Sequence, residues 1–121
     1  MNVLFVFLGG GIGSLMRYGT SVVFSRFQWT NFPVSTLISN CVSCILVGCF
    51  AAFALKSKIA EDSAFYSFFI VGICGGFSTF STFSKENFEL LNQGKYLFAV
   101  VNILISVFLT IGLVYVGRKL V

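Results

Sequence analysis

The 121-residue chain has no histidine, only four acidic residues and a single proline. The lack of histidine removes the commonest general base and the commonest neutral metal ligand. Four acidic residues leave little for a hard-cation site or for hydrolysis by paired carboxylates. The sequence shows no nucleophile–base pair and no cofactor-binding loop, so we expect a protein that is not an enzyme.

Charge is also scarce, because charged residues make up 10% of the chain where soluble domains carry about a quarter. Hydrophobic residues make up 57%, and the mean hydropathy is +0.96. The apolar residues form four runs, each near the ~20 residues that cross a bilayer core, at approximately 2–24, 33–55, 65–91 and 96–117. An open chain in lipid satisfies its backbone only as helices. The sequence therefore predicts an all-α membrane protein with one four-helix domain over residues 1–121.

The eight basic residues lie near the ends of the apolar runs and form no cluster. This pattern favours anchoring at a lipid bilayer surface over binding to nucleic acid. With four spans, one side would hold Lys56, Lys58, Arg118 and Lys119, and the other Arg17, Arg26, Lys85 and Lys95. An even count gives no strong preference for one orientation. Insertion in both directions would allow an antiparallel dimer, and a fixed orientation set by one dominant loop is the alternative.

Small and polar residues recur inside the runs. The first run contains Gly9-x-x-x-Gly13, and the second has small or polar residues four apart, at Thr36, Asn40, Cys44 and Gly48. Such residues pack neighbouring membrane helices and hydrogen-bond between them, so we expect an oligomer. The four cysteines also lie in apolar runs without metal-type pairing, and we expect them to be buried and reduced.

The third run contains the most unusual pattern, Gly75-Gly76-Phe77-Ser78-Thr79 followed by further hydroxyl residues. Adjacent glycines and a Ser/Thr run predict a broken membrane helix. A break at membrane depth must be buried in protein or line a wet cavity, where its carbonyls suit small cations. After it, Phe80 and Phe83 stand one turn apart. Their electropositive ring edges could line an anion path, with ordinary packing as the alternative.

Three motifs together identify a family. They are Gly9-Gly10-Gly11-Ile12-Gly13 with Arg17-Tyr18, Pro33-x-x-Thr36-Leu37-x-x-Asn40, and the run from Gly75 to Phe83 followed by Glu86. The chain resembles the small fluoride channels of the Fluc or CrcB-like family over essentially its whole length. The resemblance implies an antiparallel, dual-topology homodimer in the cytoplasmic cell membrane, with a structural sodium ion at its centre. It also implies passive, selective fluoride export that lowers intracellular fluoride.

The resemblance further implies roles for individual residues. It assigns the ion path to Asn40, Phe80, Ser81, Thr82 and Phe83. It assigns the sodium to main-chain oxygens of Gly75 and Ser78. Possible further members of the path are Arg17, Glu86, Asn102 and Ser106. A helix-end anchor is the alternative for Arg17, and a structural charge partner is the alternative for Glu86.

A second class of four-span protein is the proton-coupled small multidrug transporter, which is also short and often dual-topology. Such a transporter needs a carboxylate inside its first span. The four acidic residues here are Glu61, Asp62, Glu86 and Glu89, and none lies in the first run. We therefore disfavour this alternative.

Overall fold

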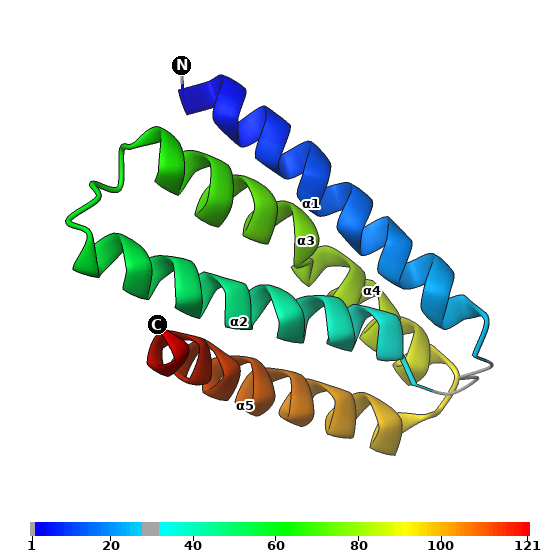
Figure 1. Cartoon of the computed structure of the whole chain (residues 1–121). Coiled ribbons are helices and arrows are strands. Elements are labelled where there is room, and N and C mark those ends of the chain that lie inside the picture. The colour runs from blue at the N-terminus through cyan, green and yellow to red at the C-terminus, as the bar shows by residue number, and fades with distance from the viewer. Residues whose placement is uncertain (1, 28–31) are drawn as a thin grey trace.

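The computed structural model describes residues 2–27 and 32–121, and in these residues it contains helices and no strand. Four helical spans are long and apolar enough to cross a membrane. They comprise α1 (Asn2–Ser25), α2 (Val34–Lys56), a third span built from η1 (Tyr66–Cys74), α3 (Gly75–Phe77) and α4 (Phe80–Asn92), and α5 (Tyr96–Leu120) (Figure 1). The predicted all-α class and the four membrane spans are confirmed. Pro33 marks one boundary, since α2 begins directly after it.

The spans pack in two pairs, with α1 against the third span and α2 along α5 (Figure 1). Glycines allow both close approaches. A Cβ built on Gly72 would lie 2.8 Å from the Cα of Gly9, and one built on Gly48 would lie 3.0 Å from the Cα of Gly117. The hydrophobic effect does not drive membrane helices together, because lipid tails are as apolar as the helix surfaces. Small residues let the backbones approach closely, and van der Waals packing then stabilises the contact. The Gly9-x-x-x-Gly13 motif thus serves contact between α1 and the third span.

The third span changes its helical geometry twice. It is π-helical from Tyr66 to Cys74, and it continues as α-helix through Gly75 to Phe77. Ser78 and Thr79 then leave the helix with ψ values of 157° and 123°, and α4 begins at Phe80. The two adjacent glycines are therefore helical, and the extended backbone falls on the hydroxyl residues that follow them. The π-helical stretch was not predicted from the sequence.

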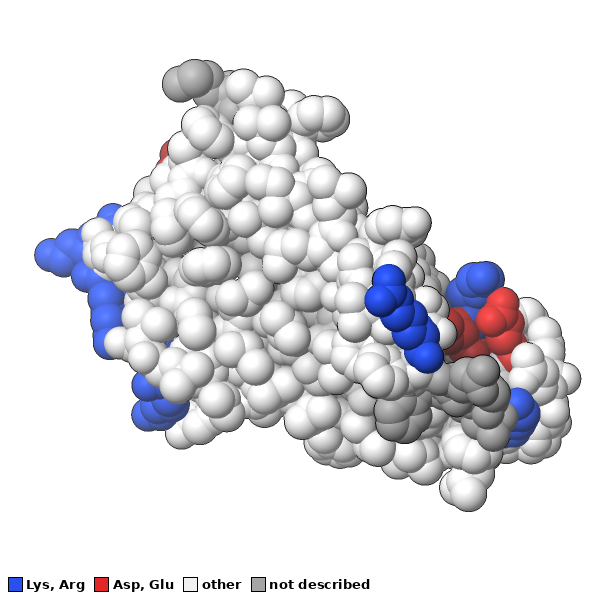
Figure 2. All heavy atoms as spheres, turned by 45° about the vertical axis from the view of Figure 1, so that its right-hand side comes forward, with Lys and Arg blue, Asp and Glu red and all other residues white. Residues whose placement is uncertain are grey.

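The interior of the single chain is small and largely polar. The largest side chains that are less than 2% exposed are those of Asn102, Cys74, Ser39 and Ser43. All four cysteines are free thiols, two buried and two half-buried. Large apolar side chains cover the outside, where they suit lipid or a second protein chain. Basic side chains gather towards the two ends of the molecule, with an uncharged band between them (Figure 2).

Candidate functional site

Two side chains of α2, Asn40 and Ser43, hydrogen-bond to the main chain at the interruption of the third span. The N–H of Thr79 donates to Asn40 Oδ1 at 2.8 Å, and Asn40 Nδ2 lies 3.4 Å from the Thr79 carbonyl oxygen. Ser43 Oγ donates to the Cys74 carbonyl oxygen at 2.8 Å. Thr79 in turn caps α4, because its Oγ1 accepts from the N–H of Thr82 at 3.3 Å. The interruption is therefore a hydrogen-bonded junction between α2 and α4.

A cavity of about 340 Å³ opens on one side of this junction, and we call it the aromatic groove. It is lined by Asn40, Cys44, Ser78, Thr79, Phe80, Phe83, Ser106, Val107, Thr110 and Ile111. The rings of Phe80 and Phe83 have centroids 5.7 Å apart and planes tilted by 39°. Phe80 is 78% exposed, so its ring is largely uncovered by the rest of the chain. The groove thus combines two aromatic rings with amide and hydroxyl groups from α2, α4 and α5.

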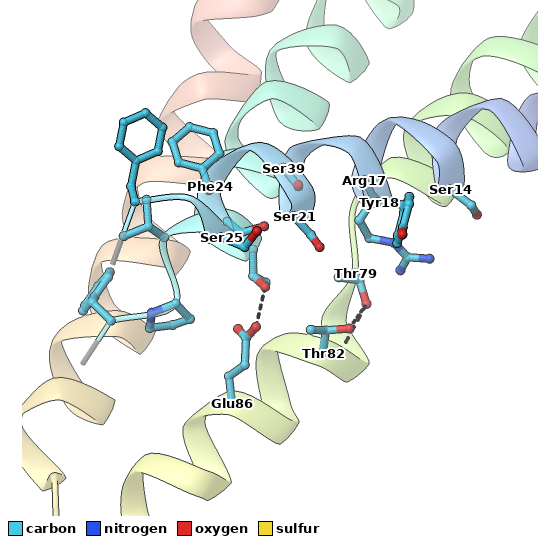
Figure 3. A pocket seen from close by; sticks show the side chains of 16 residues that line it. Ser14, Arg17, Tyr18, Ser21, Phe24, Ser25, Ser39, Thr79, Thr82 and Glu86 are labelled. Atoms are coloured by element: carbon cyan, nitrogen blue, oxygen red, sulfur yellow. Dashed lines mark hydrogen bonds between the residues drawn. The ribbon is translucent and has the colours of Figure 1, made fainter. Parts of the chain in front are cut away.

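A second cavity of about 640 Å³, the polar vestibule, lies between α1, α2 and α4 (Figure 3). It is lined by Ser14, Arg17, Tyr18, Ser21, Phe24, Ser25, Phe27, Phe32, Pro33, Val34, Ser35, Thr36, Ser39, Thr79, Thr82 and Glu86. Thr36 Oγ1 donates to Glu86 Oε1 at 2.6 Å and fixes one carboxylate oxygen. Thr79 lines both cavities.

The structure distributes the predicted path residues over the two cavities. Asn40, Phe80, Phe83 and Ser106 line the aromatic groove, whereas Thr82, Arg17 and Glu86 line the polar vestibule.

Two of the predicted path residues line neither of these cavities. Ser81 is exposed, with its Oγ 3.3 Å from Thr79 Oγ1. Asn102 is 1% exposed and is hydrogen-bonded within the protein.

Three polar residues at the site were not predicted from the sequence. Thr36 holds Glu86 from α2, Thr110 lines the groove from α5, and Asn87 is buried between α4 and α5. The sequence places Thr36 in a small-residue stripe and in the second family motif, without a role for its side chain. Thr36 and Glu86 are 50 positions apart in the chain, so no local sequence pattern indicates that they are in contact. Asn87 is a polar residue at the buried face of α4, and its position four residues after Phe83 was the available clue.

The main chain at the interruption fits a small cation of the kind that the resemblance implies. In an unbroken helix, the carbonyls of Gly75 and Ser78 would accept from the N–H groups of Thr79 and Thr82. Those two N–H groups donate instead to Asn40 Oδ1 and Thr79 Oγ1. Both carbonyls are thereby released from the helical ladder. The described residues hold no group of three or more Cys, Asp or Glu side chains suited to a metal.

Known proteins match this chain over nearly its full length. The family described as CrcB-like protein, Camphor Resistance (CrcB), matches residues 4–118. A fluoride-specific ion channel, FluC, of Flavobacterium psychrophilum is 38% identical over 116 residues, covering 96% of this chain and 93% of that protein. FluC proteins of Coxiella burnetii and Shewanella pealeana are 38% and 39% identical, covering 97% and 99% of this chain and 94% and 95% of their own. The four-span chain belongs to the CrcB-like protein family.

Proposed function

We propose that this protein is a fluoride-specific channel that lets fluoride leave the cell passively across the cytoplasmic membrane. The observation that carries the proposal is the aromatic groove, where Asn40 and the paired rings of Phe80 and Phe83 surround a helix interruption. Family membership and the names of the similar proteins support the choice of ion.

The chemistry of the path suits a small, strongly hydrated anion. A pore for such an ion must replace its water with many weak donors that also release it. Asn40 Nδ2 and the Thr82 hydroxyl supply N–H and O–H groups, and the ring edges of Phe80 and Phe83 supply weak positive potential. None of these groups has a full charge, so none holds the ion as tightly as a lysine would. Arg17, in the polar vestibule, would attract the anion towards the entrance.

The path would be completed by a second copy of the chain in the opposite orientation. Phe80 is 78% exposed although it is a large aromatic residue at membrane depth, and a Cβ added to the exposed Gly75 would meet nothing in its own chain. Both features are expected of an interface. The even distribution of basic residues permits insertion in both directions.

A structural sodium ion would be held at the dimer centre by the carbonyl oxygens of Gly75 and Ser78. When bound, the ion would supply positive charge that satisfies buried carbonyls from two interrupted helices. The chain's own contribution is to release those oxygens, which it does by engaging the N–H groups of Thr79 and Thr82 elsewhere. We propose no transport of this ion.

The test is anion efflux from liposomes that contain the purified protein, with fluoride and chloride compared in parallel. We expect rapid fluoride loss with chloride retained, and no fluoride loss from protein-free liposomes. Equal efflux of the two anions, or no efflux of either, would contradict the proposal.

A further inference from the structure

The carbonyl oxygen of Cys74 accepts three hydrogen bonds just before the interruption of the third span. The N–H of Ser78 donates to it at 3.0 Å, Ser78 Oγ donates at 3.0 Å, and Ser43 Oγ donates at 2.8 Å. A carbonyl oxygen has two lone pairs, so the three donors compete for fewer acceptor positions than they need. The donor that is held least firmly is therefore available to another acceptor.

The three donors differ in their freedom to leave the Cys74 carbonyl. The N–H of Ser78 is fixed by the main chain, where it closes the last helical turn before the interruption. Ser43 is 1% exposed and lines neither the aromatic groove nor the polar vestibule. Ser78 is half-buried and lines the aromatic groove, and a hydroxyl proton turns about its C–O bond without moving a heavy atom. Of the three donors, the Ser78 hydroxyl is thus the one that can turn to the groove.

We infer that the Ser78 hydroxyl is a hydrogen-bond donor to a small anion in the aromatic groove, and that Ser43 is the positioning residue that frees it. Ser43 does so by occupying a lone pair of the Cys74 carbonyl that the Ser78 hydroxyl would otherwise hold more firmly. The inference rests on the proposed function for the identity of the anion. It adds a role for the Ser78 side chain that is separate from the proposed role of its main-chain carbonyl.

A donor of this kind suits an ion that must be both bound and released. Between ions, the Ser78 proton returns to the Cys74 carbonyl, so the hydroxyl is never left unpaired. When an anion arrives, the proton turns to it, and the N–H of Ser78 and the hydroxyl of Ser43 still satisfy the carbonyl. The exchange of one hydrogen bond for another keeps the net gain from binding small, as conduction requires.

The first measurement is the fluoride concentration that gives half-maximal flux, taken for Ser78→Ala and for Ser78→Thr. Loss of a hydrogen bond to a charged group costs about tenfold in affinity or more, and the bond to Cys74 that is given up offsets part of this. We therefore expect the half-saturating concentration to rise at least threefold in Ser78→Ala. Ser78→Thr keeps a hydroxyl and should remain within about twofold of wild type. An unchanged value in Ser78→Ala would overturn the inference.

The second measurement tests the positioning role of Ser43. Without its hydroxyl, the Ser78 proton is held more firmly by the Cys74 carbonyl, so we expect Ser43→Ala to raise the half-saturating concentration at least twofold. In the Ser78→Ala background, Ser43→Ala should cause no further rise, and a rise that persists there would overturn the inference by showing general loosening. Ser67→Ala is the matched control, because Ser67 is a buried serine of the third span that lines neither cavity. If Ser43→Ala does not assemble, the two Ser78 variants decide.

A third measurement reports anion binding without conduction. It is the rise in melting temperature when fluoride replaces chloride at constant sodium, compared between wild type and Ser78→Ala. Both proteins share any general effect of the salt, so we expect the larger rise in wild type from bound fluoride. A wild-type protein that shows this larger rise but no flux would contradict the proposed function and support the inference. Equal rises in the two proteins would overturn the inference even if the wild type conducts.

Discussion

The backbone N–H of Thr79 and the side-chain oxygen of Asn40 lie 2.8 Å apart and join the second span to the interruption in the third. A backbone N–H only donates, so it fixes the Asn40 amide with Oδ1 towards Thr79. The amide NH2 group of Asn40 remains to serve the aromatic groove, and its contact with the Thr79 carbonyl is long at 3.4 Å. One residue thus both holds the junction and supplies a donor to the proposed path.

These two roles of Asn40 can be separated by substitution. Asn40→Asp keeps an acceptor for Thr79 but places a negative charge in the groove, so we expect a folded dimer without fluoride efflux. Asn40→Leu leaves the Thr79 N–H unpaired, and we expect a loss of about 1–3 kcal/mol in the free energy of unfolding. Efflux at the wild-type rate from Asn40→Asp would remove Asn40 from the path.

The two aromatic rings are expected to be required for flux and dispensable for folding. Phe80→Ile and Phe83→Ile remove ring edges while keeping apolar volume, so we expect fluoride efflux to fall by about tenfold or more with the dimer preserved. Phe88→Ile is the matched control, because Phe88 lies on the same helix, is 62% exposed and does not line the groove. If Phe80→Ile and Phe83→Ile both conduct fluoride as well as Phe88→Ile does, the two rings only pack the protein and do not line the ion path.

The proposed interface can be tested at Gly75, whose added Cβ would meet nothing within 4 Å in its own chain. We expect Gly75→Val to prevent dimer formation, because the added bulk would face only the second copy. Gly112→Val is the control, since it too adds a side chain into open space, on α5. Size-exclusion chromatography with light scattering in detergent measures the outcome, and a dimer with Gly75→Val would place the interface elsewhere.

Sodium should stabilise the dimer through the main chain at the interruption. We expect a higher melting temperature in sodium than in a large organic cation such as N-methylglucamine, as for any ligand that binds only the native state. Ser78→Ala should keep this difference, because the proposed ligand is the Ser78 carbonyl and not its hydroxyl. Loss of the difference in Ser78→Ala would assign the ion to the side chain.

Glycines at the helix contacts should differ sharply from glycines on the surface. A Cβ on Gly9 would lie 3.0 Å from the Gly72 Cα, whereas one on Gly11 would meet nothing. We expect Gly9→Ala to cost about 1–3 kcal/mol in the free energy of unfolding and Gly11→Ala to cost little. Denaturation in detergent compares the two, and equal stabilities would contradict the close approach of α1 to the third span.

Orientation in the membrane should respond to charge in the loop between α2 and η1. Two or three lysines added within residues 57–63 should bias insertion to one side, because basic residues set topology. Cysteine labelling near a terminal tag should change from both faces to one, and efflux should fall if an antiparallel pair is needed. Single-sided labelling of the unmodified protein would exclude dual topology.

The span pattern could be predicted because hydropathy and length report directly on lipid contact. The predicted and observed ends agree within a residue except at the last span, which continues to Leu120. Thr79, Thr82 and Glu86 are three and four residues apart, the spacing of one helical face, and all three line the polar vestibule.

Contacts between spans could not be predicted in the same way. Asn87 and Asn102 meet because α4 packs against α5, and no local pattern specifies which buried faces will oppose each other. The π-helical turns of η1 were missed because composition and spacing do not distinguish them from α-helical turns.

The pairing of glycines between α1 and the third span, and between α2 and α5, has a consequence for biosynthesis. Each span makes its closest glycine contacts with a span that is synthesised two steps later or earlier. In a nascent chain that enters the membrane span by span, the glycines of α1 therefore face lipid until the third span is inserted. The glycine of α2 that contacts α5 faces lipid until the fourth span is inserted. Domains usually assemble from the N-terminus as they are made. Here the tight packing of both helix pairs is postponed until late in translation, so early truncations would leave spans that insert without a partner.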